Sequence, residues 1–441
     1  MSKGISCFML VVLQIALVMF WWPELMKVFN KDGAVMENGD SINSDYSETN
    51  GMMIIPFPDD SNKYYLFHLL HISFQSKLYY SVIDMSYNNG LGKVTSKNIP
   101  LPISANDSLC EKLAAVKHGN GNDWWLLCHS YGNDHFYEFL ISDSGISAPI
   151  LRTAGSCLCL GDLNIIGEMC FSKDGCKLLN VTTSLADVLS FDRCAGELSS
   201  LIELNTSINP DYPFYYGCSF SPSGRFIYVS NFQDWMATNN NRLYQLDLQA
   251  PDILASKYMV YEGPSGNNYA GIGQHQLGPD DKIYISFAHS LPYYPTNADS
   301  TNLRVSIIDY PDSAGLTCNF IPFTFYLNGR MMGGGLPNMP NYNLGAIEEN
   351  GCDSLENEIA SLSSNFHFDL FPNPALSQLT LYSNFNGAKS LIIQNIFGQI
   401  VFSKKFSLTE AVIDVSELPA GVYLVTVKSS EGVFSKKVVK E

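Results

Sequence analysis

The chain has 441 residues, too many for one ordinary domain, so two or three domains are expected. It is 46% apolar and 16% charged, which excludes a disordered chain and is enough for sizeable cores. The formal net charge is −17, and residues 366–441 contribute +1 of it, so residues 1–365 form an acidic body. Such a body is a poor partner for nucleic acid or anionic lipid, and we expect no nucleic-acid partner.

The N-terminal residues 1–26 have the pattern of an export segment. Lys3 gives a basic start, and Cys7 to Trp22 is an apolar run interrupted by Gln14. The run is short for a membrane span and of the right length for a signal peptide. It lacks a small-residue cleavage motif, so a retained membrane anchor, or a natural start other than Met1, stays open.

Eleven cysteines are present, and five of them (Cys157, Cys159, Cys170, Cys176 and Cys194) lie close together. They form no C-x-x-C pair, and no histidine lies between His135 and His275. A structural metal site needs such partners. We therefore expect one or two disulfides or plain buried thiols, and we predict no metal and no cofactor. Cys352 is a candidate for tying the following linker to the body.

Residues 27–343 read as short strands separated by turns. The strand runs are rich in β-branched and aromatic residues, Gly, Asn, Asp and Pro punctuate them, and no helical periodicity extends over three turns. This pattern excludes the alternating strands and helices of a parallel-sheet enzyme. The predicted strands are 64–70, 77–85, 124–130, 135–142, 225–231, 242–248, 282–288 and 303–310.

An internal repeat organises this region. Residues 168–182, 217–231 and 275–288 each place an apolar residue before a turn rich in Ser, Gly and Asp, and a hydrophobic strand follows. Weaker copies are 114–130 and 53–69. A period near 50 residues with about four strands per unit is typical of β-propeller blades. The region resembles the WD-like or quinoprotein-like propellers of secreted Gram-negative proteins, and its length predicts about six blades, possibly seven.

The segment between the body and the tail changes composition. Residues 344–365 are rich in Glu, Asp, Ser and Asn, which predicts an acidic linker. Just before it, residues 327–342 are expected to form the last strand and closing loop. Their Gly333-Gly334-Gly335 run lacks the Lys-Ser/Thr of a phosphate-binding loop, so we expect a close-packed turn there.

The tail, residues 366–441, predicts about seven strands. They are 366–371, 378–383, 389–395, 399–405, 410–414, 421–428 and 432–439, separated by Pro-, Gly- and Asn-containing turns. Alternating apolar residues indicate half-buried strands. Seven strands in so short a segment predict a small Ig-like β-sandwich.

Four blocks of the tail identify it further. FPNPALSQLTLY, IIQNIFGQIVFS, IDVSELPAGVYLVTV and FSKKVVKE resemble, in order and spacing, the type A C-terminal sorting domain of the type IX secretion system. Asn395 stands where that family often has Asp. The resemblance implies recognition by the outer-membrane translocon, a signal peptide, passage through the periplasm, and release or attachment at the cell surface. It assigns the sorting signal to Pro372, Asn373, Pro374, Gly398, Gly421, Tyr423, Lys436, Lys437, Val439 and Lys440.

Candidate chemistry in the body is sparse. His118 and His275 occupy similar places just before repeat turns, and such positions in a propeller can face the central channel. They are our candidate binding residues, although hydrogen bonds that cap the turns are the favoured explanation of both. No G-x-S-x-G, H-E-x-x-H or P-loop motif occurs, so no catalytic residue is assigned.

Three functions are consistent with the sequence. The first is a secreted or surface-displayed propeller that binds an extracellular glycan or protein, or serves a structural role. The second is an extracellular propeller hydrolase or lyase acting on polysaccharide or peptide, since paired carboxylates need not be close in sequence. The third is a component of the cell envelope anchored by residues 7–22. Whether the protein is an enzyme is left open, with binding favoured.

Overall fold

The structure is a computed structural model that divides into two compact units, Met1–Gly351 and Cys352–Glu441. It describes residues 15–18, 27–44, 49–72, 75–104, 107–157, 165–204, 215–231, 241–263, 270–289, 301–330, 332, 335–347, 352, 368–384, 387, 389–395, 400–429 and 432–441. The described residues are almost entirely strand and turn, with two short 3-10 helices, η1 (Asn88–Gly90) and η3 (Gly315–Cys318). The all-β fold predicted from the sequence is confirmed.

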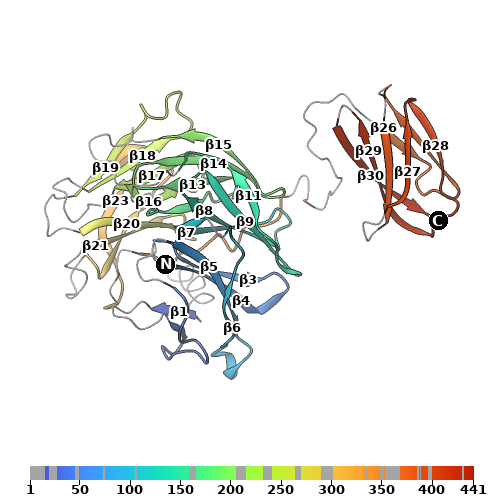
Figure 1. Cartoon of the computed structure of the whole chain (residues 1–441). Helices are drawn as coiled ribbons and strands as arrows, with labels where there is room; N and C mark the ends of the chain where they lie inside the picture. Colours follow the sequence, from blue (N-terminus) through green and yellow to red (C-terminus); the bar gives the residue numbers. More distant parts are fainter. Residues whose placement is uncertain are drawn as a thin grey trace. The chain divides into compact units, whose positions relative to one another are not determined.

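Besides one two-stranded sheet, the described part of the first unit contains five larger antiparallel sheets, here called blades 1 to 5, each formed by consecutive strands (Figure 1). Blade 1 holds β3 (Met52–Phe57), β4 (Asp60–Ile72), β5 (Gln75–Asp84) and β6 (Lys93–Pro100). Blade 2 holds β7 (Ser108–Lys117), β8 (Trp124–Tyr131) and β9 (His135–Ser142), and both β10 (Gly145–Ile146) and β11 (Ile150–Thr153) pair with β9. Blade 3 holds β12 (Met169–Phe171), β13 (Lys177–Val181), β14 (Ala186–Asp192) and β15 (Glu197–Glu203).

Blades 4 and 5 follow the same order. Blade 4 holds β16 (Tyr215–Phe220), β17 (Phe226–Asn231), β18 (Arg242–Asp247) and β19 (Tyr258–Glu262). Blade 5 holds β20 (Ala270–Leu277), β21 (Ile283–His289), β22 (Arg304–Ile308) and β23 (Phe320–Tyr326). Blades 1, 3, 4 and 5 are therefore simple four-stranded meanders, as is typical of a propeller, whereas in blade 2 both β10 and β11 are added to β9.

The sequence repeat and the blades correspond one to one. Each of the five repeat copies supplies the end of a blade's first strand, a turn, and the blade's second strand. In blade 4, Ser221 Oγ accepts the backbone N–H of Phe226 at 3.1 Å, and Gly224 donates its N–H to the Ser221 carbonyl at 2.8 Å. Gly224 has a φ of 68°, a conformation that favours glycine. The repeated turn sequence therefore forms the strand reversal that the sequence pattern predicted.

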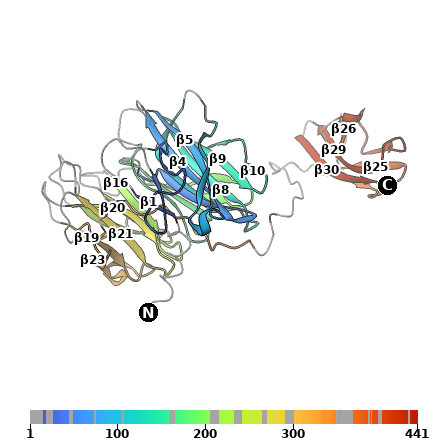
Figure 2. The ribbon, with the colours of Figure 1, turned by 90° about the horizontal axis from the view of Figure 1, so that it is seen from below.

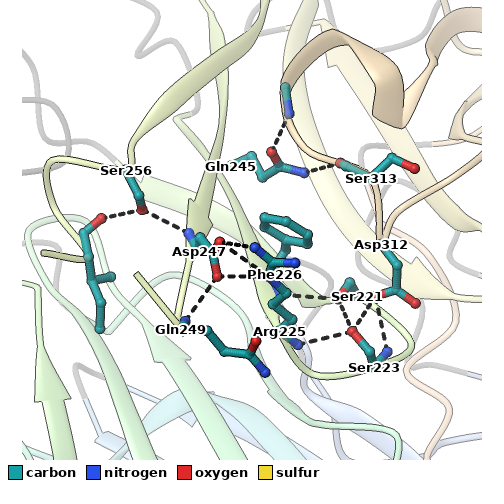
Figure 3. A network of polar contacts seen from close by, with 12 residues as sticks. Ser221, Ser223, Arg225, Phe226, Gln245, Asp247, Gln249, Ser256, Asp312 and Ser313 are labelled. Carbon is teal, nitrogen blue, oxygen red and sulfur yellow. Dashed lines mark hydrogen bonds and ion pairs between the residues drawn. The ribbon is translucent and has the colours of Figure 1, made fainter. Parts of the chain in front are cut away.

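Figure 3 shows how the blade 4 turn is also joined to blade 5. Ser223 Oγ donates to Asp312 Oδ1 at 2.5 Å, and Gln245 Nε2 donates to the Ser313 carbonyl at 2.8 Å. Within blade 4, Arg225 forms an ion pair with Asp247, with 2.6 Å between Nη2 and Oδ2. The polar side chains of the repeat turn therefore fix one blade against the next.

Four apolar cores lie between successive blades. Because blade 2 has a blade on each side, alternate residues of β8 enter different cores: Trp124 and Leu126 pack toward blade 1, whereas Trp125 and Leu127 pack toward blade 3. Two further cores join blade 3 to blade 4 and blade 4 to blade 5. Burial on both faces explains the nearly continuous apolar runs in the sequence. Figure 2 shows blades 1 and 2 stacked beside each other, with β4 and β5 near β8 and β9.

The outer face of blade 1 is covered by the N-terminal segment. Val28, Met36 and Ile42 pack there against Ile54, Leu66 and other residues of the blade. The segment itself includes β2 (Lys27–Asn30), which pairs with β1 (Ile15–Val18) in a two-stranded sheet. The described residues therefore form five blades, where length alone predicted about six, possibly seven, and the described residues 27–44 pack as a cover of blade 1.

A strap, residues 335–347, crosses back over the unit after β23. Asn338 Nδ2 donates to the Leu113 carbonyl at 2.8 Å, the Tyr342 hydroxyl donates to the Ile54 carbonyl at 2.8 Å, and Arg193 Nη2 donates to the Gly345 carbonyl at 2.6 Å. Residues 344–347, expected to begin the linker, are thus packed on blades 2 and 3. Gly333 and Gly334, and residues 353–365 of the predicted linker, lie outside the described residues.

The second unit forms the seven predicted strands, with ends within two residues of those expected. One sheet holds β24 (Phe368–Phe371), β25 (Gln378–Ser383) and β28 (Glu410–Asp414). The other holds β27 (Ile400–Phe406), β26 (Lys389–Asn395), β29 (Gly421–Ser429) and β30 (Gly432–Lys440). Residues from both sheets, among them Leu379, Leu391 and Val425, share one buried core. The unit is therefore a β-sandwich.

Gln274 connects the last blade of the first unit to the segment that precedes the first blade. Its side chain joins blade 5 to the segment before blade 1, donating to the Thr49 carbonyl and to Asn50 Oδ1, and it accepts the N–H of Leu336 in the strap at 2.6 Å. The Gln274→Ala variant leaves these buried groups unpaired, so we expect a loss of about 1–3 kcal/mol in unfolding free energy in denaturant titration. The exposed Gln249→Ala is the matched control, and an equal effect of both variants would contradict this role.

Candidate functional site

A cavity of ≈ 380 Å³ lies at the centre of the first unit. All five blades and the strap contribute to its wall, as expected for the channel of a propeller. The polar residues that line it are Asn50, Glu168, Ser172, Lys173, Cys218, Ser219, His275, Gln276, Asp281, Asn338, Asn341 and Asn343. Apolar residues such as Met53, Met169, Phe171 and Leu277 complete the wall.

Glu168 is the buried centre of this site, with 3% of its surface exposed. Its Oε2 accepts the backbone N–H of Cys218 at 2.8 Å and that of His275 at 3.0 Å, so one carboxyl group joins the first strands of blades 4 and 5 to blade 3. Burial raises the pKa of Glu168 to about 8, although these amides, the Asn50 side chain and the charge of Lys112 oppose the shift.

Lys112 completes the buried charged group from blade 2. Its side chain is fully buried, and Nζ donates to the Val181 carbonyl of blade 3 at 2.6 Å. Burial lowers the pKa of Lys112, opposed by nearby acidic groups that include Glu111 and Asp187. Lys112 also pairs through its backbone with Asn50, which precedes blade 1. Sequence reasoning missed both Glu168 and Lys112. The available signal was an ionisable residue within the first strand of a blade (Lys112) or directly before it (Glu168).

His275, one of the two predicted binding residues, lines the cavity. Nε2 lies 3.0 Å from Ser230 Oγ, and Nδ1 lies 3.3 Å from Ser219 Oγ. Burial lowers the pKa of His275 to about 3, so the ring is neutral at physiological pH. The adjacent Gly217 is required sterically, because a β-carbon there would lie 2.2 Å from the Gly273 carbonyl oxygen.

His118, the other predicted residue, lies elsewhere. Its Nε2 is 3.0 Å from the Cys194 carbonyl, and Nδ1 accepts the N–H of Asn120 at 3.1 Å. It therefore caps the turn between β7 and β8, and it is not among the described residues that line the cavity. The structure does not bring His118 and His275 together. Within the described ranges, no group of three or more His, Cys, Asp or Glu side chains is arranged to hold a metal ion.

The mouth of the cavity carries charged and amide side chains. Lys173 in the blade 3 turn forms an ion pair with Asp281 in the blade 5 turn, with 2.5 Å between Nζ and Oδ1. Asn341 of the strap donates to the Lys173 carbonyl at 2.9 Å, and Asn343 is exposed beside it. These groups are accessible, whereas Glu168 and His275 are already hydrogen-bonded within the wall. The arrangement is therefore suited to recognition of a polar ligand at its mouth.

The cysteines show both oxidation states. Cys194 and Cys352 are disulfide-bonded, as expected of an exported protein. The described cysteines that are not disulfide-bonded are Cys110, Cys128, Cys157, Cys170, Cys176, Cys218 and Cys318.

In the second unit the two ends of the predicted sorting signal meet. Asn373, between Pro372 and Pro374, accepts the N–H of Val439 at 2.9 Å and donates to the Lys437 carbonyl at 3.1 Å. Lys436 forms an ion pair with Asp369 at 2.8 Å. The chain end follows the same edge, because Ala375 forms a parallel bridge with Lys440.

Other parts of the sorting signal fix the preceding strand. Gly421 begins β29, and the Tyr423 hydroxyl donates to the Pro419 carbonyl at 2.8 Å. Gly398 lies outside the described residues. The motif residues that are described are therefore built into the framework of the sandwich.

Comparison with known protein families agrees with the division of the chain into a body and a C-terminal unit. Residues 369–441 match the family described as secretion system C-terminal sorting domain. A search of curated proteins gave no match.

Three solved structures with similar folds are distant from this chain in sequence. PorZ, described as an essential bacterial surface component of the type IX secretion system of Porphyromonas gingivalis, is 11% identical with a TM-score of 0.30, over 94% of this chain and 63% of PorZ. The periplasmic gluconolactonase PpgL of Pseudomonas aeruginosa is 9% identical with a TM-score of 0.41, over 91% and 98%. Hydrazine synthase of Kuenenia stuttgartiensis is 14% identical with a TM-score of 0.35, over 59% and 63%. The chain thus spans less than two thirds of two of these proteins.

The class of protein is therefore an all-β propeller followed by a small β-sandwich. The sandwich is a C-terminal sorting domain of the type IX secretion system, and it directs the chain to the secretion machinery and to the cell surface or the medium.

No helix in the described part of the chain is long and apolar enough to cross a membrane.

The buried carboxyl group predicts a pH effect. The folded-state pKa of Glu168, about 8, lies above its ordinary value, so its contribution to stability is lost as pH rises toward 8. Glu168→Gln keeps an acceptor for both amides and removes the ionisation. We expect the unfolding free energy of this variant, relative to wild type, to increase from pH 5 to pH 8 in denaturant titrations.

The exposed Glu197→Gln in β15 is the control for removal of one negative charge. A difference between Glu168→Gln and wild type that does not change with pH would contradict the buried, proton-binding role of Glu168.

Proposed function

We propose that this protein is an exported, surface-displayed propeller that binds an extracellular glycan or protein segment at the mouth of its central cavity. The observation that carries the proposal is the cavity of ≈ 380 Å³, whose rim presents Lys173, Asp281 and the strap asparagines to solvent. Amide side chains and a charge pair around a partly apolar hollow suit a polar ligand with an apolar face.

The state of the buried groups favours binding over catalysis. Both nitrogens of His275 face serine hydroxyls, and the pKa of His275 is too low for a general base near neutral pH. Glu168 accepts two backbone amides inside the wall, which leaves its carboxyl group engaged in the framework. These contacts support a binding module. A hydrolase or lyase acting on polysaccharide or peptide is the alternative.

The proposal also includes the route by which the protein is exported. The sorting domain requires delivery to the periplasm, which we assign to residues 1–26 as a signal segment. The outer-membrane translocon then recognises the folded C-terminal unit, and the propeller is released or attached at the surface. The Ig-like character of the sandwich and the residue-level sorting signal belong to this proposal.

A substitution at the cavity mouth tests ligand binding. Asn343→Trp places a large ring at an exposed position of the strap whose own side chain faces the cavity mouth. On a glycan and peptide array probed with the full chain, we expect hits of the wild type to weaken about tenfold or more in this variant. Asn122→Trp, exposed on the β7–β8 turn and outside the cavity wall, is the control. Equal binding by all three proteins, or turnover of a bound glycan or peptide, would contradict a binding module.

Truncation tests the sorting signal. Deleting residues 435–441 removes most of β30, which pairs along its whole length with β29. We expect the protein to accumulate in the periplasm with a folded propeller, as measured by fractionation and limited proteolysis. Lys404→Ala, on the exposed strand β27 of the same unit, is expected to reach the surface normally. Surface delivery of the truncated chain would refute the assignment.

A further inference from the structure

Two free thiols lie next to each other in the wall of the cavity. Cys170 is in β12 of blade 3 and Cys218 is in β16 of blade 4, and their Sγ atoms are 3.8 Å apart. Both line the cavity. A disulfide bond needs about 2.05 Å between sulfurs, so the two Sγ atoms must approach each other by about 2 Å.

The two thiols differ in accessibility. Cys218 is fully buried, and its Sγ donates to the Glu168 carbonyl at 3.6 Å. Burial raises the pKa of Cys218, with the neighbouring Cys170 adding to the shift. Cys170 is only partly buried and lies at the cavity surface. A small reagent that enters the cavity therefore meets Cys170 before Cys218.

The setting of the protein is oxidising. The sorting domain directs the chain out of the cytoplasm. Disulfides persist in the oxidising compartments outside it. Cys194 and Cys352 are already disulfide-bonded. A close pair of thiols in such a protein is therefore exposed to exchange with other disulfides during or after export.

We propose that Cys170 and Cys218 are a redox-active pair that forms a disulfide between blades 3 and 4, with a low-molecular-weight disulfide as the oxidant. The Cys170 thiolate attacks one sulfur of the oxidant and forms a mixed disulfide, and the other sulfur leaves as a thiolate that takes up the proton lost by Cys170. Cys218 then attacks Cys170 Sγ and releases the second thiol, which takes up the proton from Cys218. Two protein thiols are oxidised, and the small disulfide is reduced to two thiols.

The bond would act on the framework around the cavity. It would link the first strands of two blades beside the Glu168 amide contacts, and it would close a loop of residues 170–218. A cross-link over such a loop restricts the unfolded chain and stabilises the fold. We expect oxidation to raise the melting temperature on the order of 5 °C. This consequence is independent of which ligand the cavity binds.

The experiment treats the folded full-length protein with oxidised glutathione at pH 8, blocks the remaining thiols with iodoacetamide in denaturant, and maps unreduced peptides by mass spectrometry. The expected result is a Cys170–Cys218 linked peptide together with the higher melting temperature. Cys170→Ser is expected to abolish both changes. Cys176→Ser, which removes an exposed thiol from the same turn region, is expected to leave both unchanged.

Two outcomes would overturn the proposal. The first is alkylation of both Cys170 and Cys218 after oxidation, with no change in melting temperature. The second is recovery of Cys170 only as a stable glutathione adduct or linked to Cys157 or Cys176. A circular-dichroism spectrum of Cys170→Ser matching wild type shows that a negative result with this variant does not come from misfolding.

Discussion

The propeller depends on one buried carboxyl group. Glu168 belongs to blade 3, yet its oxygen accepts backbone amides from blades 4 and 5, the Asn50 side chain approaches it, and the charge of Lys112 from blade 2 acts on it. A buried carboxyl group is costly unless it is hydrogen-bonded, so these contacts offset the burial of Glu168 while they join the blades. The apolar cores join blades in successive pairs. The polar centre joins all of them at once, and Gln274 closes the remaining gap between blade 5 and Asn50.

This constraint divides the cavity into two zones with different roles. The groups at depth, Glu168 and His275, already have hydrogen-bond partners in the wall, and changing them alters the ring itself. The groups at the mouth, Lys173, Asp281 and Asn343, are exposed and bear little on the cores. Recognition can therefore vary at the rim while the buried centre is kept. The same division explains why the most perturbed pKa values mark the framework here, although such values often mark catalytic sites.

Much of this architecture could be predicted from sequence because it is encoded locally. Turn residues such as Gly224 set strand reversals, and alternating apolar residues set strand faces, so the strands and the five repeat copies were correctly located. The length of the region predicted about six blades, possibly seven, and the described residues form five, since the described residues 27–44 pack on blade 1 without the repeated turn pattern. The polar centre could not be predicted either. Glu168, Cys218 and His275 are neighbours only after three blades close, and nothing local distinguishes His275 from the turn-capping His118.

In the sorting domain, unlike in the propeller, residues that form long-range contacts are also the residues of the sequence motif. Its diagnostic blocks lie at opposite ends of the unit, yet Asn373 pairs with the backbone of β30, and Lys436 pairs with Asp369. The Tyr423 hydroxyl likewise secures the turn before β29. These side chains are engaged within the sandwich, so their spacing reports how its edges are joined. A motif built from such contacts is detectable in sequence because the fold constrains it. Substituting Asn373 would therefore alter the shape presented at this edge even where no exposed side chain changes.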